Sequence, residues 1–130
     1  MDFFKTIKIA SALGAISVLI GAFGAHGLEE ILSNNSRIET FETAVRYQFY
    51  HAIALLIVGL LMRFNESKYL IWAVRFFLLG ILVFSGSLYI LSLTNYTLLG
   101  AVTPLGGLFF ILGWLALYQS VQNKNSAIKI

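Results

Sequence analysis

The chain has 130 residues, of which 58% are apolar and 12% charged, and its mean hydropathy is +0.83. An ordinary soluble domain is about 45–50% apolar and about 25% charged, and a disordered segment combines low hydropathy with high net charge. The composition excludes both classes and predicts an integral membrane protein. The sequence contains no cysteine, which excludes disulfides and thiolate chemistry. The net charge of +3 is gathered beside apolar stretches, which indicates membrane topology and not nucleic-acid binding.

Four apolar stretches predict membrane-spanning helices at about residues 7–28, 44–63, 69–93 and 98–121. A bilayer core of about 30 Å needs about 20 helical residues. The first stretch also resembles a secretory signal peptide, but its apolar part exceeds the usual length of about 7–15 residues, so we expect it to remain as a span. We therefore predict an all-α, polytopic membrane protein in which residues 1–130 form a single domain, a bundle of four transmembrane helices.

The second uncharged stretch, between Arg46 and Arg63, is short for a span, so its helix is expected to begin earlier in the chain. Ser36 and Glu39 have the spacing of a capping box, with Ser36 as the N-cap. A helix that begins at Arg37 and ends at Arg63 would span the bilayer and project into the interface. Glu42 and Arg46, four residues apart on the projecting part, are expected to form an ion pair.

The charged residues are divided unequally between the two sides of such a bundle. One side would hold Lys5, Lys8, Arg63, Lys68, Arg75, Lys124 and Lys129 against Asp2 and Glu66, and the other Arg37 and Arg46 against Glu29, Glu30, Glu39 and Glu42. Lys and Arg favour the cytoplasmic side of short loops. Both termini are therefore predicted to be cytoplasmic, in a multi-pass protein of the cell membrane. Trp114 and Tyr118 are expected in the aromatic belt of the cytoplasmic interface.

Small residues and one proline mark the first and fourth stretches. The glycines expected to pack helices together are Gly14, Gly21, Gly24, Gly100, Gly106, Gly107 and Gly113. Helices in lipid associate through close packing, so we expect the first and fourth helices to touch. The same faces could instead bind a second copy or another membrane protein. Pro104 predicts a kink that frees the carbonyl of Gly100, with Thr103 or a serine of the third span as its partner.

Polar residues of all four spans form a candidate cluster, expected in the outer half of the bilayer: His26, Tyr47, Gln48, His51, Ser85, Ser87 and Thr103. Polar residues inside a membrane are costly and often functional, but they also serve as hydrogen bonds between helices. A helical wheel predicts that Gln48 and His51 face the bundle interior. On the same wheel, Phe49, Ile53 and Ile57 face lipid or apolar packing.

No cofactor, metal or catalytic residue is expected. His26 and His51 could serve as the two axial ligands of a haem b, but nothing identifies anchors for its propionates. A zinc site would need a third ligand at suitable spacing, and none accompanies the pair. The spans contain no nucleophile with a nearby base, no phosphate-binding glycine loop and no paired carboxylates.

Five motifs, one or more in each span, resemble those of a known family. They are Gly21-Ala22-Phe23-Gly24-Ala25-His26, Tyr47-Gln48 with His51, Phe84-Ser85-Gly86-Ser87-Leu88-Tyr89, Thr103-Pro104-Leu105-Gly106-Gly107 and Gly113-Trp114. In this order they resemble the bacterial "domain of unknown function 423" family, whose vertebrate relative is called transmembrane protein 256. The resemblance implies a small four-helix protein of the bacterial plasma membrane. It implies no reaction, substrate or cofactor.

Two classes of function are consistent with the sequence. The preferred one is a non-enzymatic structural or accessory protein of the membrane, such as a subunit of a larger complex, because about 20 residues per span leave loops too short for a second domain. The alternative is a binder or conduit for a lipid, quinone, proton or small solute, acting through the polar cluster. A pocket open to lipid or water at the level of His51 would favour the alternative. An enzyme that acts on lipid has only the two histidines in its favour.

Overall fold

The structure is a computed structural model that describes residues 1–127, with side chains to residue 122, and its regular elements within that part are all helical. The elements are α1 (Phe3–His26), α2 (Glu29–Asn34), α3 (Ile38–Leu61), α4 (Lys68–Gly80), the π-helical segment η1 (Ile81–Ser85), α5 (Gly86–Thr94) and α6 (Leu99–Ala127). Four helices are long and apolar enough to cross a membrane: Phe3–His26, Ile38–Leu61, Lys68–Thr94 and Leu99–Gln122. The prediction of an all-α chain with four such helices is confirmed. Lys129 and the side chain of Lys124, both counted above, lie outside the described residues.

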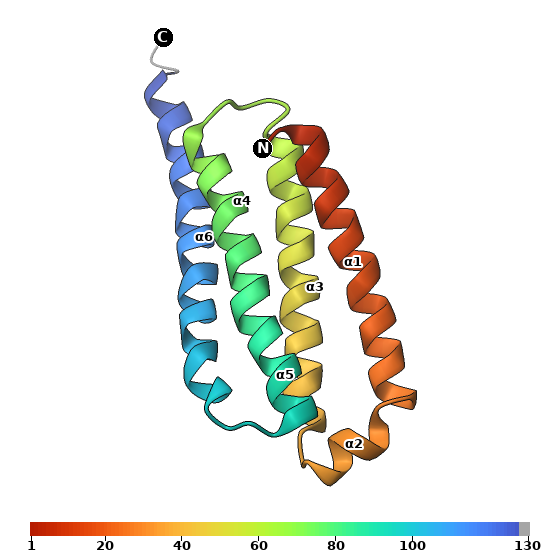
Figure 1. Cartoon of the computed structure of the whole chain (residues 1–130). Helices are drawn as coiled ribbons and strands as arrows, with labels where there is room; N and C mark the ends of the chain where they lie inside the picture. Colours follow the sequence, from red (N-terminus) through yellow and green to blue (C-terminus); the bar gives the residue numbers. More distant parts are fainter. Residues whose placement is uncertain (128–130) are drawn as a thin grey trace.

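The four long helices are arranged as an open row (Figure 1). α4, η1 and α5 follow one another as a single long helix, the third span. α1 packs along α3, α3 packs on the third span, and α6 packs on the far side of the third span. The start of α1, the end of α6 and the loop after α3 lie at one end of the row, while α2 lies at the other end. The predicted close contact between the first and fourth helices is therefore wrong, because α1 and α6 occupy opposite edges.

Four glycines allow a phenylalanine of the adjacent helix to pack closely, through its ring at Gly24, Gly80 and Gly113 and through its backbone at Gly106. A Cβ added at any of four glycines would overlap atoms of a phenylalanine. The pairs are Gly24 with Phe41, Gly80 with Phe110, Gly106 with Phe84 and Gly113 with Phe77. The first pair joins α1 to α3, and the other three join α6 to the third span. Small residues thus do mediate close packing here, but between different helices from those expected.

Three of the glycines expected to pack helices play little part in packing within the chain. The position that a Cβ would take at Gly14 or Gly100 has no neighbouring atom within 4 Å, and at Gly107 the nearest atom is 3.9 Å away, on the Phe84 ring. At Gly21 a Cβ would meet Val45 at 3.2 Å. Gly14 and Gly100 therefore leave open space on the surface of the row.

The turn before α3 differs from the predicted capping box. Ser36 has a φ of 54°, a left-handed conformation, whereas an N-cap residue is normally extended. The Ser36 N–H donates to the Ser33 carbonyl at 3.0 Å and the Arg37 N–H donates to the Leu32 carbonyl at 2.8 Å. These two bonds form a Schellman motif that closes α2. The capping-box prediction is wrong because Ser36 ends a short helix instead of beginning the long one.

Candidate functional site

Gln48 joins three helices at a buried position of α3. Its side chain is 4% exposed. The Nε2 amide donates to the Leu13 carbonyl of α1 at 3.2 Å, and Oε1 accepts a hydrogen bond from the Tyr89 hydroxyl of α5 at 2.8 Å. Both ends of the amide are therefore used to hold the row together.

His51 lies one helical turn further along α3 and is 5% exposed. Its Nδ1 lies 2.8 Å from the Tyr47 carbonyl, and its Nε2 accepts from the indole N–H of Trp114 at 3.1 Å. Since a carbonyl can only accept, the two bonds together require the hydrogen on Nδ1 and the lone pair on Nε2. The ring also stacks on Phe110, with centroids 3.6 Å apart and planes 9° apart. The imidazole is thus fixed on both edges and on one face.

The orientation of α3 is as the helical wheel predicts. Gln48 and His51 are buried and bonded to other helices, which avoids the cost of an unsatisfied polar group in hydrocarbon. Phe49, Ile53 and Ile57 are 38%, 44% and 48% exposed on the opposite side of the helix. The predicted ion pair between Arg46 and Glu42 also forms, at 2.8 Å.

Three further polar residues of the expected cluster form two separate hydrogen bonds between helices. Ser85 donates to the Ala44 carbonyl of α3 at 2.8 Å, whereas the Ser87 hydroxyl lies 2.7 Å from that of Thr103 on α6. Two residues apart on a helix, side chains point about 200° apart, so the serines face different neighbours. Thr103 also donates to the Leu99 carbonyl at 3.2 Å, not to that of Gly100 as predicted. α6 continues through Pro104.

His26 takes no part in these hydrogen bonds between helices. It is the exposed last residue of α1, close to the level at which Gly24 packs against Phe41. His51 follows Phe41 by ten residues, a rise of about 15 Å along α3. One haem iron between the two histidines is therefore excluded by this geometry. Within the described residues, no group of three or more His, Asp or Glu side chains is placed to hold a metal ion.

A groove opens between α3 and α6 beside His51, with a volume of about 610 Å³. We call it the His51 groove, and it is lined by Tyr47, His51, Phe84, Pro104, Gly107, Leu108, Phe110, Ile111 and Trp114. Five of these side chains carry planar rings. Gly107 contributes no side chain, which leaves the groove open on the α6 side.

Trp114 forms one wall of this groove. Its indole bonds to His51, and its side chain is 48% exposed on the surface of the row. The loop beyond α3 reaches α6 at Ser120, whose carbonyl accepts from Asn65 at 3.2 Å. Trp114 precedes Ser120 by six residues, about 9 Å of helical rise. Trp114 therefore lies further along α6 from the Asn65 contact, beside His51, and its place in the cytoplasmic aromatic belt stays a prediction.

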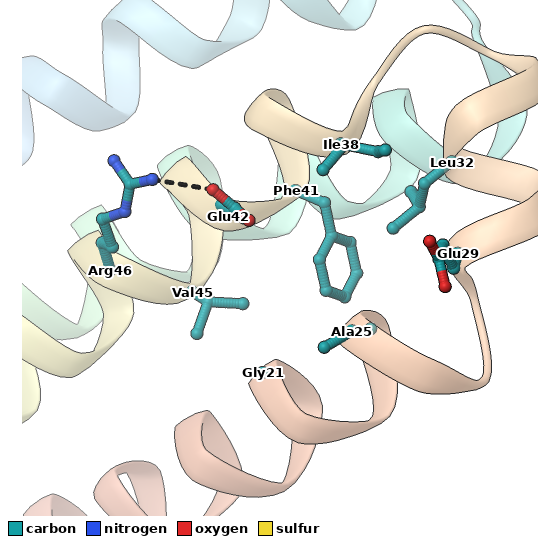
Figure 2. A pocket seen from close by; sticks show the side chains of 10 residues that line it. Gly21, Ala25, Glu29, Leu32, Ile38, Phe41, Glu42, Val45 and Arg46 are labelled. Atoms are coloured by element: carbon teal, nitrogen blue, oxygen red, sulfur yellow. Dashed lines mark hydrogen bonds and ion pairs between the residues drawn. The ribbon is translucent and has the colours of Figure 1, made fainter.

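A second hollow lies at the α2 end of the row, where α1, α2 and α3 meet (Figure 2). Its volume is about 350 Å³. The residues that line this α2 crevice are Gly21, Gly24, Ala25, Glu29, Leu32, Ile38, Phe41, Glu42, Val45 and Arg46. Sequence reasoning did not find it, because it treated the segment between the first two spans as a loop and so overlooked α2.

Sequence reasoning also missed the partners of the buried polar residues. Tyr89 and Trp114 belong to the sequence motifs, but the sequence does not indicate that the Tyr89 hydroxyl donates to Gln48 or the Trp114 indole to His51. Polar atoms of buried side chains in the described part of the chain all have a hydrogen-bond partner. The candidate site therefore consists of buried polar side chains that hydrogen-bond to one another or to the backbone, beside an open groove lined by aromatic rings.

Four apolar helices with polar side chains satisfied between them define a small multi-pass membrane protein. Residues 20–107 match the family described as "Protein of unknown function (DUF423)". The chain is 49% identical over 118 residues to a UPF0382 membrane protein of Staphylococcus haemolyticus, covering 88% of this chain and 95% of that protein. It is 42% identical over 114 residues to the UPF0382 membrane protein YwdK of Bacillus subtilis, with 84% and 92% covered.

A more distant relative extends the similarity over nearly the whole chain. A UPF0382 membrane protein of Haemophilus influenzae is 36% identical over 122 residues, 93% of this chain and 97% of that protein. No solved structure matches the chain. The chain belongs to the DUF423 family, as its motifs indicated, and is a multi-pass bacterial membrane protein.

Proposed function

We propose that the protein is a non-enzymatic membrane protein that binds a bilayer-soluble molecule, such as a lipid chain or a quinone ring, in the His51 groove. The observation that carries the proposal is the groove itself. Its volume of about 610 Å³ falls within the range of about 300–1,000 Å³ typical of ligand pockets. It lies between two helices that are each apolar enough to span a membrane, so a molecule dissolved in the bilayer can reach it directly.

The chemistry of the groove favours binding over catalysis or transport. Both nitrogens of His51 are already bonded, to Tyr47 and Trp114, so the imidazole has no free position for proton transfer. The ring faces of Tyr47, Phe84 and Trp114 remain to contact a ligand. Aromatic pairs contribute about 0.5–1.5 kcal/mol beyond their buried area. Recognition would therefore rest on shape and ring contact, and less on charge.

Two glycines of α6 provide the test. Leucine at Gly107 would enter the groove without a clash at Cβ, whereas leucine at Gly100 would enter open space elsewhere. The purified protein is extracted with organic solvent, and the extract is quantified by mass spectrometry. We expect a molecule bound at about one per chain, retained in Gly100→Leu and lost in Gly107→Leu. Equal amounts of every lipid in the wild type and both variants would refute binding in the groove.

An accessory role is the second candidate, supported by the surface of α1. This helix lies at one edge of the row and packs on α3. Gly14 and the exposed residues Ser11 and Ala15 form a patch of small residues on its surface, which allows close approach of another helix there. A photo-reactive residue at Ala15, compared with one at the exposed Leu82 of η1, would capture a protein partner or a second copy in native membranes. Capture of lipid alone at both positions would count against this role.

A further inference from the structure

The α2 crevice combines a charged rim with an apolar floor. Figure 2 shows Glu29 on one side of the Phe41 ring and the ion pair of Glu42 and Arg46 on the other. Gly21 and Ala25 of α1 lie below, and their small size leaves the space that the crevice occupies. The crevice is independent of the His51 groove, since the two share no lining residue.

The crevice has a defined shape because its walls are fixed. The Phe41 ring, 4% exposed, packs against Gly24, where even a Cβ would overlap it. The Schellman motif at Ser36 sets the angle between α2 and α3. Asn35, the residue before Ser36, ties this turn to α5, because its side-chain amide donates to the carbonyls of Ser92 and Leu93 at 3.1 and 3.2 Å.

The charges on the rim favour a ligand that carries a cation beside an anion. Glu29 and Glu42 outnumber the single guanidinium of Arg46. Within the described residues, the Glu29 carboxylate forms no hydrogen bond or ion pair, so it is available to an ammonium group. Arg46 uses one nitrogen for Glu42 and keeps other N–H donors for a phosphate oxygen. A headgroup with only negative charge would meet a net repulsive rim.

An apolar groove continues from the crevice along α1 and α3. It has a volume of about 440 Å³ and is lined by Ser17, Val18, Gly21, Ala22, Val45, Arg46, Phe49 and Tyr50. Gly21, Val45 and Arg46 line both hollows. Together they form one continuous surface, which we call the α1–α3 seam: charged where the helices leave the hydrocarbon and apolar along the span.

We propose that the α1–α3 seam binds one phospholipid of the ethanolamine type from the leaflet at the α2 end. Its ammonium group binds Glu29 and Glu42, its phosphate binds Arg46, and one acyl chain lies along the apolar part of the seam. Charge complementarity selects the headgroup, and the groove of about 440 Å³ accommodates the chain. The site is separate from the His51 groove and does not depend on binding there.

Native mass spectrometry from membranes of defined composition tests the headgroup. The probes are phosphatidylethanolamine and phosphatidylglycerol with identical acyl chains. We expect the wild type to retain the ethanolamine lipid about tenfold better, equivalent to about 1.4 kcal/mol. Glu29→Gln should abolish this preference. Glu30→Gln is the matched control, because Glu30 is the adjacent, equally charged and exposed residue of α2 but does not line the crevice, and it should leave the preference intact.

The position of the acyl chain needs its own variants. Ala22→Phe fills the apolar part of the seam and should lower retention of both lipids, whereas Ala12→Phe, also exposed on α1 but outside the seam, should not. Equal retention of the two lipids by the wild type would overturn the proposal, as would equal effects of Glu29→Gln and Glu30→Gln. A dimer that dissociates in Ala22→Phe while lipid retention is unchanged would assign the seam to a second copy instead. Circular dichroism confirms that each variant is folded.

Discussion

Buried polar residues in this protein are placed by the need for partners more than by the gain from bonding. An unsatisfied polar group in hydrocarbon costs several kcal/mol, while a bond between helices contributes about 0.6 kcal/mol on average. His51 illustrates the consequence: its two nitrogens and one ring face are all occupied by groups of α3 and α6. The imidazole therefore fixes how these two helices meet across the groove.

The bond between His51 and Trp114 should be measurable as a coupling energy. His51→Phe keeps a ring to stack on Phe110 but removes the acceptor, and Trp114→Phe removes the donor. We expect each single variant to lower the free energy of unfolding, and the pair to show a coupling of about 0.6–1.7 kcal/mol. Unfolding in mixed micelles of the wild type, both single variants and the double variant provides the cycle. Strict additivity would show that the two side chains contribute independently.

At the scale of the elements, η1 and α6 fit together as one packing unit. The π-helical turn of Ile81–Ser85 inserts an extra residue into the third span, a feature often found near functional sites. Phe84 in this turn contributes its ring to the groove and its backbone to the contact with Gly106. The groove and the close backbone contact of Gly106 in α6 thus depend on the same residue.

Gly106 should tolerate substitution far less than its counterpart at Gly100. An alanine Cβ at Gly106 would overlap backbone atoms of Phe84, which cannot rotate away, so we expect a loss of about 1–3 kcal/mol in the free energy of unfolding. Alanine at Gly100 meets no neighbouring atom and should change stability by about 0.5 kcal/mol or less. Denaturation in mixed micelles measures both variants of the same helix. A similar loss at both positions would indicate a general effect of glycine replacement on α6.

The elements also show what the sequence can and cannot predict. The four spans follow from hydropathy and length, and the direction of Gln48 and His51 follows from the polar stripe of one helix. The neighbours of each helix do not follow, because a glycine indicates close approach without naming the phenylalanine that fills the space. α2, with six residues, is too short to show a helical period, so the sequence pattern places Ser36 at the start of α3 instead of at the end of α2. The α2 crevice depends on that same short helix and was missed for the same reason.

The whole molecule is a row with two kinds of position. In the most apolar windows of the spans, 44% of residues are buried within α3 and within the third span, but only 17% in α1 and 22% in α6. The two central spans are therefore largely covered by other helices of the chain, while α1 and α6 leave most of their surface open to lipid or to partners. The exposed surface of α1 is therefore the one on which we propose a protein partner or a lipid, whereas the internal hydrogen bonds of Gln48, His51 and Ser85 converge on α3.

The orientation of the row in the membrane is the last prediction. Lys and Arg are concentrated at the end that carries the start of α1, the end of α6 and the loop after α3, and the positive-inside rule predicts that this end is cytoplasmic. The chain has no cysteine, so single cysteines can be introduced without background labelling. Asn34 at the α2 end and Glu66 in the loop after α3 are both exposed. An impermeant thiol reagent on intact cells should label a cysteine at Asn34 and not one at Glu66, and both should react once the membrane is opened. Labelling of the second position alone would reverse the orientation, and with it the leaflet from which the α1–α3 seam draws its lipid.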